Sequence, residues 1–143
     1  MNLSFAFAVN QDNVFENRHF GDADKYLIYR EDLNGMEKLI EFVNPFKMLD
    51  EEKEHGSRKK GLAIIEALRK KNVNVLVSRQ FGRNIKLVNR HFIPVIVQKD
   101  TTEEVIQVLM GHLHWIREEW EQNKTEFKMF TIKAGILKSA VDG

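Results

Sequence analysis

Two histidines lie beside cationic side chains in segments that have no regular apolar pattern. His19 follows Arg18, and His55 lies three residues before Arg58. Imidazole is a good ligand for transition metals, and guanidinium groups bind anions. The chain has no cysteine, so a bound metal would have to be held by histidine, by carboxylates or by an external ligand. His19 and His55 are therefore the candidate metal ligands.

Glycines and arginines near these histidines, and in a third segment around residue 80, extend the candidate site. Glycine lets backbone N–H groups approach a ligand. The predicted cofactor-binding set is His19, Gly21, His55, Gly56, Arg79, Gly82 and Arg83. These residues can act together only if their loops converge at the carboxyl ends of the strands, where ligands of open α/β sheets collect. The alternative is that His19 packs beside Phe20, the arginines are solvated and each glycine only makes a turn.

The composition indicates one globular domain, and the net charge predicts no strong overall electrostatic field. Of 143 residues, 43% are hydrophobic and 30% are charged, and the formal net charge is +1. No segment approaches the ~20 apolar residues of a membrane-spanning helix, and Met1 to Val9 lacks the features of a signal peptide. We therefore expect a cytoplasmic protein without a membrane partner. The near-neutral charge argues against tight nonspecific binding of nucleic acid.

The first half of the chain predicts three strands. Residues 3–9 place large apolar side chains on one side and small ones on the other, which is typical of a central strand covered on both faces. Residues 25–29 and 36–43 form the next two strands, and Asn34-Gly35 is a strong hairpin turn signal. The charged run of residues 50–60 is interpreted as solvated surface.

The middle of the chain alternates helix and strand. Residues 58–71 form a helix whose apolar stripe is Leu62, Ile65 and Leu68, with Ser57 as its N-cap. A strand at 73–77, a helix at 83–89 and a strand at 92–97 follow, and the two strands should be parallel neighbours. Since proline cannot donate to a ladder, Pro94 places the last of these strands at a sheet edge.

A helix from about residue 102 to 122 opens the C-terminal part. Thr101 and Glu104 have the spacing of a capping box, and Gly111 marks a close approach or a bend. A short strand within 126–133 and a frayed end complete the chain. We divide the chain into a domain of residues 1–113 and an extension of residues 114–143. The extension could cover the sheet edge, lengthen the core or pair two chains through Trp115 and Trp120.

Several of these segments, in this order, resemble the dinitrogenase iron-molybdenum cofactor biosynthesis family, which includes the NifX-like proteins. They are Phe15-Glu16-Asn17-Arg18-His19-Phe20-Gly21, His55-Gly56, the strand at 73–77 leading to Gly82, Ile93-Pro94-Val95-Ile96-Val97 and Thr102-Glu103-Glu104-Val105. The resemblance covers roughly residues 1–113. It implies a ribonuclease-H-like fold with a five-stranded mixed sheet flanked by helices.

The same resemblance implies a role in binding or passing on iron-molybdenum or iron-sulfur cluster cofactors or their precursors. The partners would then be the cluster and its donor or acceptor proteins, and the protein would not be an enzyme. Clusters of this class carry negative charge, which fits histidine beside arginine. One departure is that Ser78-Arg79-Gln80-Phe81-Gly82-Arg83 stands where the family has Gly-x-x-Gly-Pro, so an arginine replaces both the first glycine and the proline.

Two other functions compete with the carrier hypothesis. A nuclease would need several carboxylates around a metal pair, and the strand at 3–9 offers none. A regulatory or protein-interaction module without a cluster could use a basic patch of Arg58, Lys59, Lys60, Arg79, Arg83 and Arg90. This second alternative stays open on the sequence.

Overall fold

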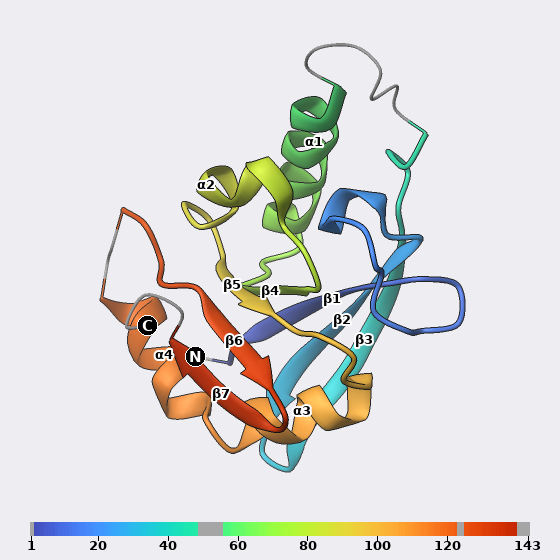
Figure 1. The fold of residues 1–143 in the computed structure, drawn as a ribbon. Helices are drawn as coiled ribbons and strands as arrows, with labels where there is room; N and C mark the ends of the chain where they lie inside the picture. The colour runs from blue at the N-terminus through green and yellow to red at the C-terminus, as the bar shows by residue number, and fades with distance from the viewer. Residues whose placement is uncertain (1, 49–55, 123–124, 140–143) are drawn as a thin grey trace.

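The computed structural model describes residues 2–48, 56–122 and 125–139, which form a mixed sheet with helices on both faces (Figure 1). The order of its seven strands is β3-β2-β1-β4-β5-β6-β7. They are β1 (Ser4–Val9), β2 (Lys25–Asp32), β3 (Gly35–Val43), β4 (Val75–Ser78), β5 (Ile93–Ile96), β6 (Phe130–Lys133) and β7 (Ile136–Ser139). The helices are α1 (Gly56–Lys70), α2 (Ile85–Val88), α3 (Thr102–Met110) and α4 (Leu113–Glu121), with 3-10 turns η1 (Phe20–Asp22) and η2 (Gly82–Asn84). The α/β class is confirmed, and the predicted count of five strands is wrong.

Strand β1 lies inside the sheet, between β2 and β4, and all six of its residues are buried. Phe5 and Phe7 face a core that α3 and α4 cover, whereas Ala6 and Ala8 face the core under α1 and α2. The alternation of large and small residues thus matches two apolar layers, as predicted. The small side chains leave room on the α1 side for large ones from elsewhere, among them the fully buried Tyr26.

The predicted hairpin is confirmed. Strands β2 and β3 pair antiparallel, and the pairing runs from Lys25 with Val43 to Asp32 with Gly35 beside the turn. A bulge at Ile28 and Tyr29 shifts the register. Strand β3 is one edge of the sheet.

Helix α1 begins at Gly56, earlier than predicted, so Ser57 lies within the helix and does not precede it. Ile64, Ile65 and Leu68 are its buried apolar residues. Ile65 and Leu68 are buried as predicted, but Leu62 is 42% exposed, so the buried stripe is shifted in helical phase from the predicted one. The shift also puts Lys60 on the buried face, because Lys60, Ile64 and Leu68 are spaced four residues apart.

The strand that contains Pro94 is not at an edge, in contrast to the prediction. Strand β5 pairs parallel with β4 on one side and with β6 on the other. The N–H groups of Ile93 and Val97 donate to Asn74 and Ser78, at 2.9 and 3.1 Å. Alternate N–H groups point to opposite sides, so the Pro94 nitrogen points away from β4. Pairing with β6 begins only at Val95, and the missing donor is therefore tolerated.

The single helix predicted near the C-terminus is two helices that meet at Gly111 and His112. The Thr101 capping box is confirmed, with Glu104 N–H donating to Thr101 Oγ1 at 3.1 Å and Thr101 N–H to Glu104 Oε1 at 2.8 Å. The last strands, β6 and β7, form an antiparallel hairpin that extends the sheet beyond β5. The extension covers the edge of the sheet beside β5 and also lengthens the core, to which it adds Ile116, Phe130, Ile132 and Leu137. Pairing of two chains stays a prediction. No described helix has the length and apolar character needed to cross a bilayer.

The packing of β6 predicts that the extension stabilises the whole fold. Ile132 is fully buried in the core beside β5, whereas Ile136 in the same hairpin is 55% exposed. Ile132→Ala should lower the free energy of unfolding by about 2–5 kcal/mol. Ile136→Ala should change it by no more than about 0.5 kcal/mol. Urea unfolding of both variants measures the difference, and equal effects would contradict the described packing.

Candidate functional site

The loops that follow β1 and β4 meet at the carboxyl ends of these two parallel strands, as the sequence predicted. Phe20 N–H donates to the carbonyl oxygen of Gln80 at 3.0 Å, which joins η1 to the segment after β4. Gly82 packs against the His19 side chain, since a Cβ on Gly82 would lie 3.6 Å from His19 Cβ. His19, Gly21 and Gly82 are therefore brought together on one rim of the sheet.

His19 precedes η1 and acts as its N-cap. Its Nδ1 accepts a hydrogen bond from Gly21 N–H at 3.0 Å, so the proton of the neutral ring lies on Nε2. Nε2 is 3.1 Å from Asp22 Oδ2. The ring also contacts Phe20 edge-on, with a centroid distance of 6.0 Å. Both nitrogens thus have protein partners, and a metal could bind the imidazole only after one of these contacts opens.

Asp22 connects His19 to helix α1 through a buried ion pair. Its second carboxylate oxygen, Oδ1, accepts a hydrogen bond from Lys60 Nζ at 2.9 Å, and the side chains of Lys60 and Asp22 are 3% and 9% exposed. The interpretation of residues 50–60 as solvated charge is therefore wrong for Lys60, whereas Arg58 and Lys59 are exposed. Residues 50–55 lie outside the described residues.

Two further side chains hold the backbone of η1 from the hairpin. Tyr26 OH donates to the Phe20 carbonyl at 2.6 Å, and Asn44 Nδ2 donates to the carbonyls of Gly21 and Ala23 at 2.9 and 2.8 Å. Burial, and secondarily the charge of Asp22, raises the pKa of Tyr26 well above its ordinary value. The phenol therefore stays protonated and keeps donating.

Two glycines are required by this geometry. Gly82 has φ +62, in the left-handed region that side chains disfavour. At Gly21 a Cβ would lie 2.9 Å from His19 Cε1 and 3.2 Å from Lys60 Cδ. A side chain at Gly21 would thus separate the histidine from the lysine.

The remaining residues of the predicted site are Arg79, Arg83, Gly56 and His55. Arg79 donates a hydrogen bond to Asn17 Oδ1, and Gln80 Nε2 donates to the Asn17 carbonyl at 2.8 Å, so Arg79 lies beside the loop of His19. Arg83 is exposed in η2. Gly56 is the first residue of α1. His55 lies outside the described residues, so its pairing with His19 stays a prediction.

The sequence interpretation missed Asp22, Lys60, Tyr26 and Asn44. Lys60 could have been found, because a lysine in phase with Ile64 and Leu68 must be buried and therefore needs a partner. Within the described part of the chain, no group of three His, Asp or Glu side chains could hold a metal ion.

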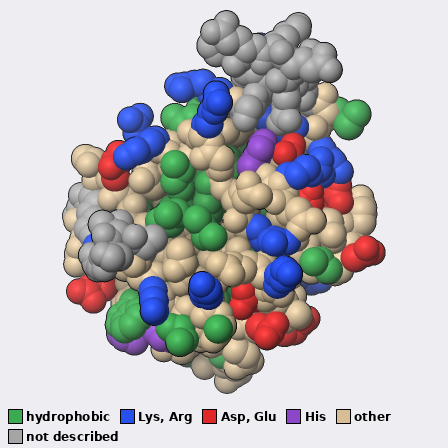
Figure 2. Space-filling model, viewed as in Figure 1, with side chains coloured by type: hydrophobic (Ala, Val, Ile, Leu, Met, Phe, Trp, Pro, Cys, Tyr) green, Lys and Arg blue, Asp and Glu red, His purple; other side chains and the backbone are tan. Residues whose placement is uncertain are grey.

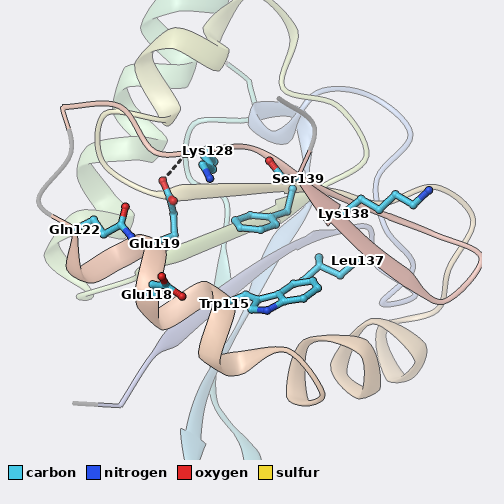
Figure 3. A pocket seen from close by; sticks show the side chains of 9 residues that line it. Trp115, Glu118, Glu119, Gln122, Lys128, Leu137, Lys138 and Ser139 are labelled. Atoms are coloured by element: carbon cyan, nitrogen blue, oxygen red, sulfur yellow. Dashed lines mark hydrogen bonds between the residues drawn. The ribbon is translucent and has the colours of Figure 1, made fainter. Parts of the chain in front are cut away.

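A separate cavity of about 480 Å³ lies between α4 and the β6–β7 hairpin, away from these residues. In Figure 3, Trp115, Glu118 and Glu119 of α4 lie on one side of it, with Gln122 just after the helix. Leu137, Lys138 and Ser139 of β7 lie on the other side, and the Lys138 side chain points away from α4. Lys128 N–H donates to Glu119 Oε2 at 2.8 Å at its side. Nearly all of its lining comes from the extension.

Comparison with known proteins places most of the chain in one family. The family described as "Dinitrogenase iron-molybdenum cofactor" matches residues 1–111. Among solved structures, a Methanocaldococcus jannaschii protein described as a candidate dinitrogenase is similar in fold. The TM-score is 0.56 at 19% identity, over 78% of this chain and 90% of the other. No curated protein matches the sequence.

The buried ion pair makes a stability prediction. Lys60→Met leaves the Asp22 carboxylate buried without its cation and should lower the free energy of unfolding by about 3–5 kcal/mol. Lys59→Met, a change of the same type at the exposed neighbouring position, should have little effect. In the double variant Lys60→Met/Asp22→Asn the loss should be smaller than the sum of the single losses, because the two groups interact directly. Denaturant unfolding of the wild type, Lys60→Met, Asp22→Asn and the double variant gives the coupling energy, and a value near zero would refute the pair.

Proposed function

Since the chain belongs to the dinitrogenase iron-molybdenum cofactor family, we propose that it binds an anionic iron-molybdenum or iron-sulfur cluster, or a precursor, as cargo. It would hold the cluster at the rim formed by η1 and the loop after β4 and pass it between donor and acceptor proteins. The role is that of a carrier, without bond-making chemistry of its own. The ribonuclease-H-like classification of the fold is likewise an inference from the family.

One observation carries the proposal: the family region brings His19 and Arg79 onto the same rim, where their loops are joined by the 3.0 Å Phe20–Gln80 hydrogen bond. Imidazole can coordinate iron, and a guanidinium group compensates negative charge. The carboxyl ends of parallel strands are where ligands of open α/β sheets collect. The replacement of the family's first glycine by Arg79 adds a cation to this place.

The contacts of His19 indicate how it could become a ligand. Its Nε2 faces Asp22, whose other oxygen is paired with Lys60. If the ring turns away from Asp22, the carboxylate keeps its buried cation, so opening costs the hydrogen bonds of the ring but leaves no unpaired charge. Release of the cargo restores the contact. A donor set with so few metal ligands suits temporary holding better than permanent coordination.

The competing functions find less support. A nuclease with two metals needs clustered carboxylates, which neither β1 nor any other described part of the chain supplies. A protein-interaction module without a cluster is the second candidate. It is favoured by the exposure of Arg58, Lys59, Arg83 and Arg90, which are free to meet an acidic surface. Cargo binding distinguishes the two functions.

Anaerobic reconstitution with iron and sulfide, or with isolated iron-molybdenum cofactor, tests the proposal. The wild type should retain metal after desalting, as measured by elemental analysis and visible absorption. His19→Asn keeps a side-chain acceptor for the Gly21 N–H but removes the imidazole, and it should lower retention at least tenfold at an unchanged unfolding midpoint. His55→Ala tests the second predicted ligand in the same assay. Arg79→Gln should also weaken retention.

Arg30→Gln is the matched control for Arg79→Gln, because Arg30 is exposed and pairs with Ser4 at the opposite end of β1. It should retain metal like the wild type. A wild type that retains no metal would reject the carrier role and favour the interaction module. Unchanged retention in His19→Asn would reject His19 as a ligand.

A further inference from the structure

We propose that a cleft on the rim that carries His19, completed by the C-terminal extension, binds a small multivalent oxyanion through Arg79, Lys99 and Lys133. The cleft has a volume of about 540 Å³. Its walls come from the ends of three adjacent parallel strands: Arg79 and Gln80 follow β4, Gln98 and Lys99 follow β5, and Lys133 ends β6. The inference goes beyond the proposed cluster binding, because neither a metal nor a histidine takes part in it.

Topology explains why three cations from distant parts of the sequence meet here. Strands β4, β5 and β6 are parallel neighbours, so their carboxyl ends lie on one rim. The chain turns immediately after Lys133, where Ala134 and Gly135 have φ values of +52 and +76. In Figure 1 this turn lies beside the start of α3. Figure 2 shows several Lys and Arg side chains on this face, with Asp and Glu side chains among them and below them.

The charges of the cleft favour an anion. None of its three cations forms an ion pair with a described carboxylate, and the hydrogen bond of Arg79 goes to the neutral amide of Asn17. The two carboxylates in the lining already accept backbone hydrogen bonds. Asp100 Oδ1 accepts from Gln98 N–H at 3.2 Å, and Glu104 Oε1 accepts from Thr101 N–H at 2.8 Å. With three cations and two carboxylates in its lining, the cleft carries a net charge of +1.

The same lining limits the size and charge of the ligand. Two carboxylates beside three cations would repel a long polyanion, which argues against a nucleic-acid strand. The volume falls in the range of small-molecule sites. Ammonium, guanidinium and carboxamide groups all donate hydrogen bonds to oxygen. These features fit a compact phosphate-bearing or polycarboxylate molecule.

Titration of the metal-free protein with pyrophosphate and with citrate tests the proposal and separates the two oxyanion classes. Isothermal calorimetry at low ionic strength should detect binding of at least one probe, and added salt should weaken it. Lys133→Gln and Lys99→Gln should each weaken binding about tenfold, the effect of losing one charge-assisted hydrogen bond. Lys138→Gln is the matched control, because Lys138 is in the same hairpin but lines the other cavity. It should bind like the wild type.

Two results would overturn the inference. One is that the wild type binds both probes more weakly than about 10 mM, which corresponds to less than 3 kcal/mol. The other is that Lys138→Gln weakens binding as much as Lys133→Gln, which would mean that only general surface charge is sensed. Since the assay contains no cluster, its failure leaves the carrier proposal intact, and failure of reconstitution leaves the oxyanion cleft intact.

Discussion

The buried ion pair between Asp22 and Lys60 is the constraint on which the candidate site depends. Two opposite charges that are removed from water must stay together, so the first turns of α1 are fixed against the turn that follows β1. His19 joins this pair as a third residue. Asp22 contacts one of its ring nitrogens, and Gly21 N–H donates to the other. The position of the imidazole therefore follows from a contact between two segments that are 38 residues apart.

The features that the sequence predicted well are those with local causes. The Thr101 capping box needs only four consecutive residues, and the alternation in β1 needs only a strand with two covered faces. The hairpin at Asn34-Gly35 is equally local. The predicted stripe of α1 was wrong only at Leu62, because Leu62 and Ile64 differ little in character and only packing against the sheet decides which of them is buried.

The sequence indicated where two loops of the candidate site would have to meet, but not the contacts they make, and ligand binding by the site stays a prediction. The rule that ligands collect at the carboxyl ends of parallel strands placed the loops of His19 and Gly82 together, and this is what the structure has. The partners of His19 were not predicted, because Lys60 was assigned to solvent by its charge and Asp22 was given no role. Charged residues are exposed unless they are paired, and a pairing over this distance leaves no local pattern. Whether His55 joins the site stays a prediction.

The position of Pro94 explains how the extension adds side chains to the rim without changing the strands of the matched region. A proline was expected to end the sheet, yet its nitrogen faces the side on which β6 starts to pair one residue later. The sheet can therefore grow beyond β5, and a strand that joins it in parallel must end on the rim where β1 and β4 end. Any side chain at the end of β6 becomes a rim residue by topology alone. Lys133 is such a residue, so a strand outside the matched region of 1–111 contributes charge to the surface on which the family region places His19.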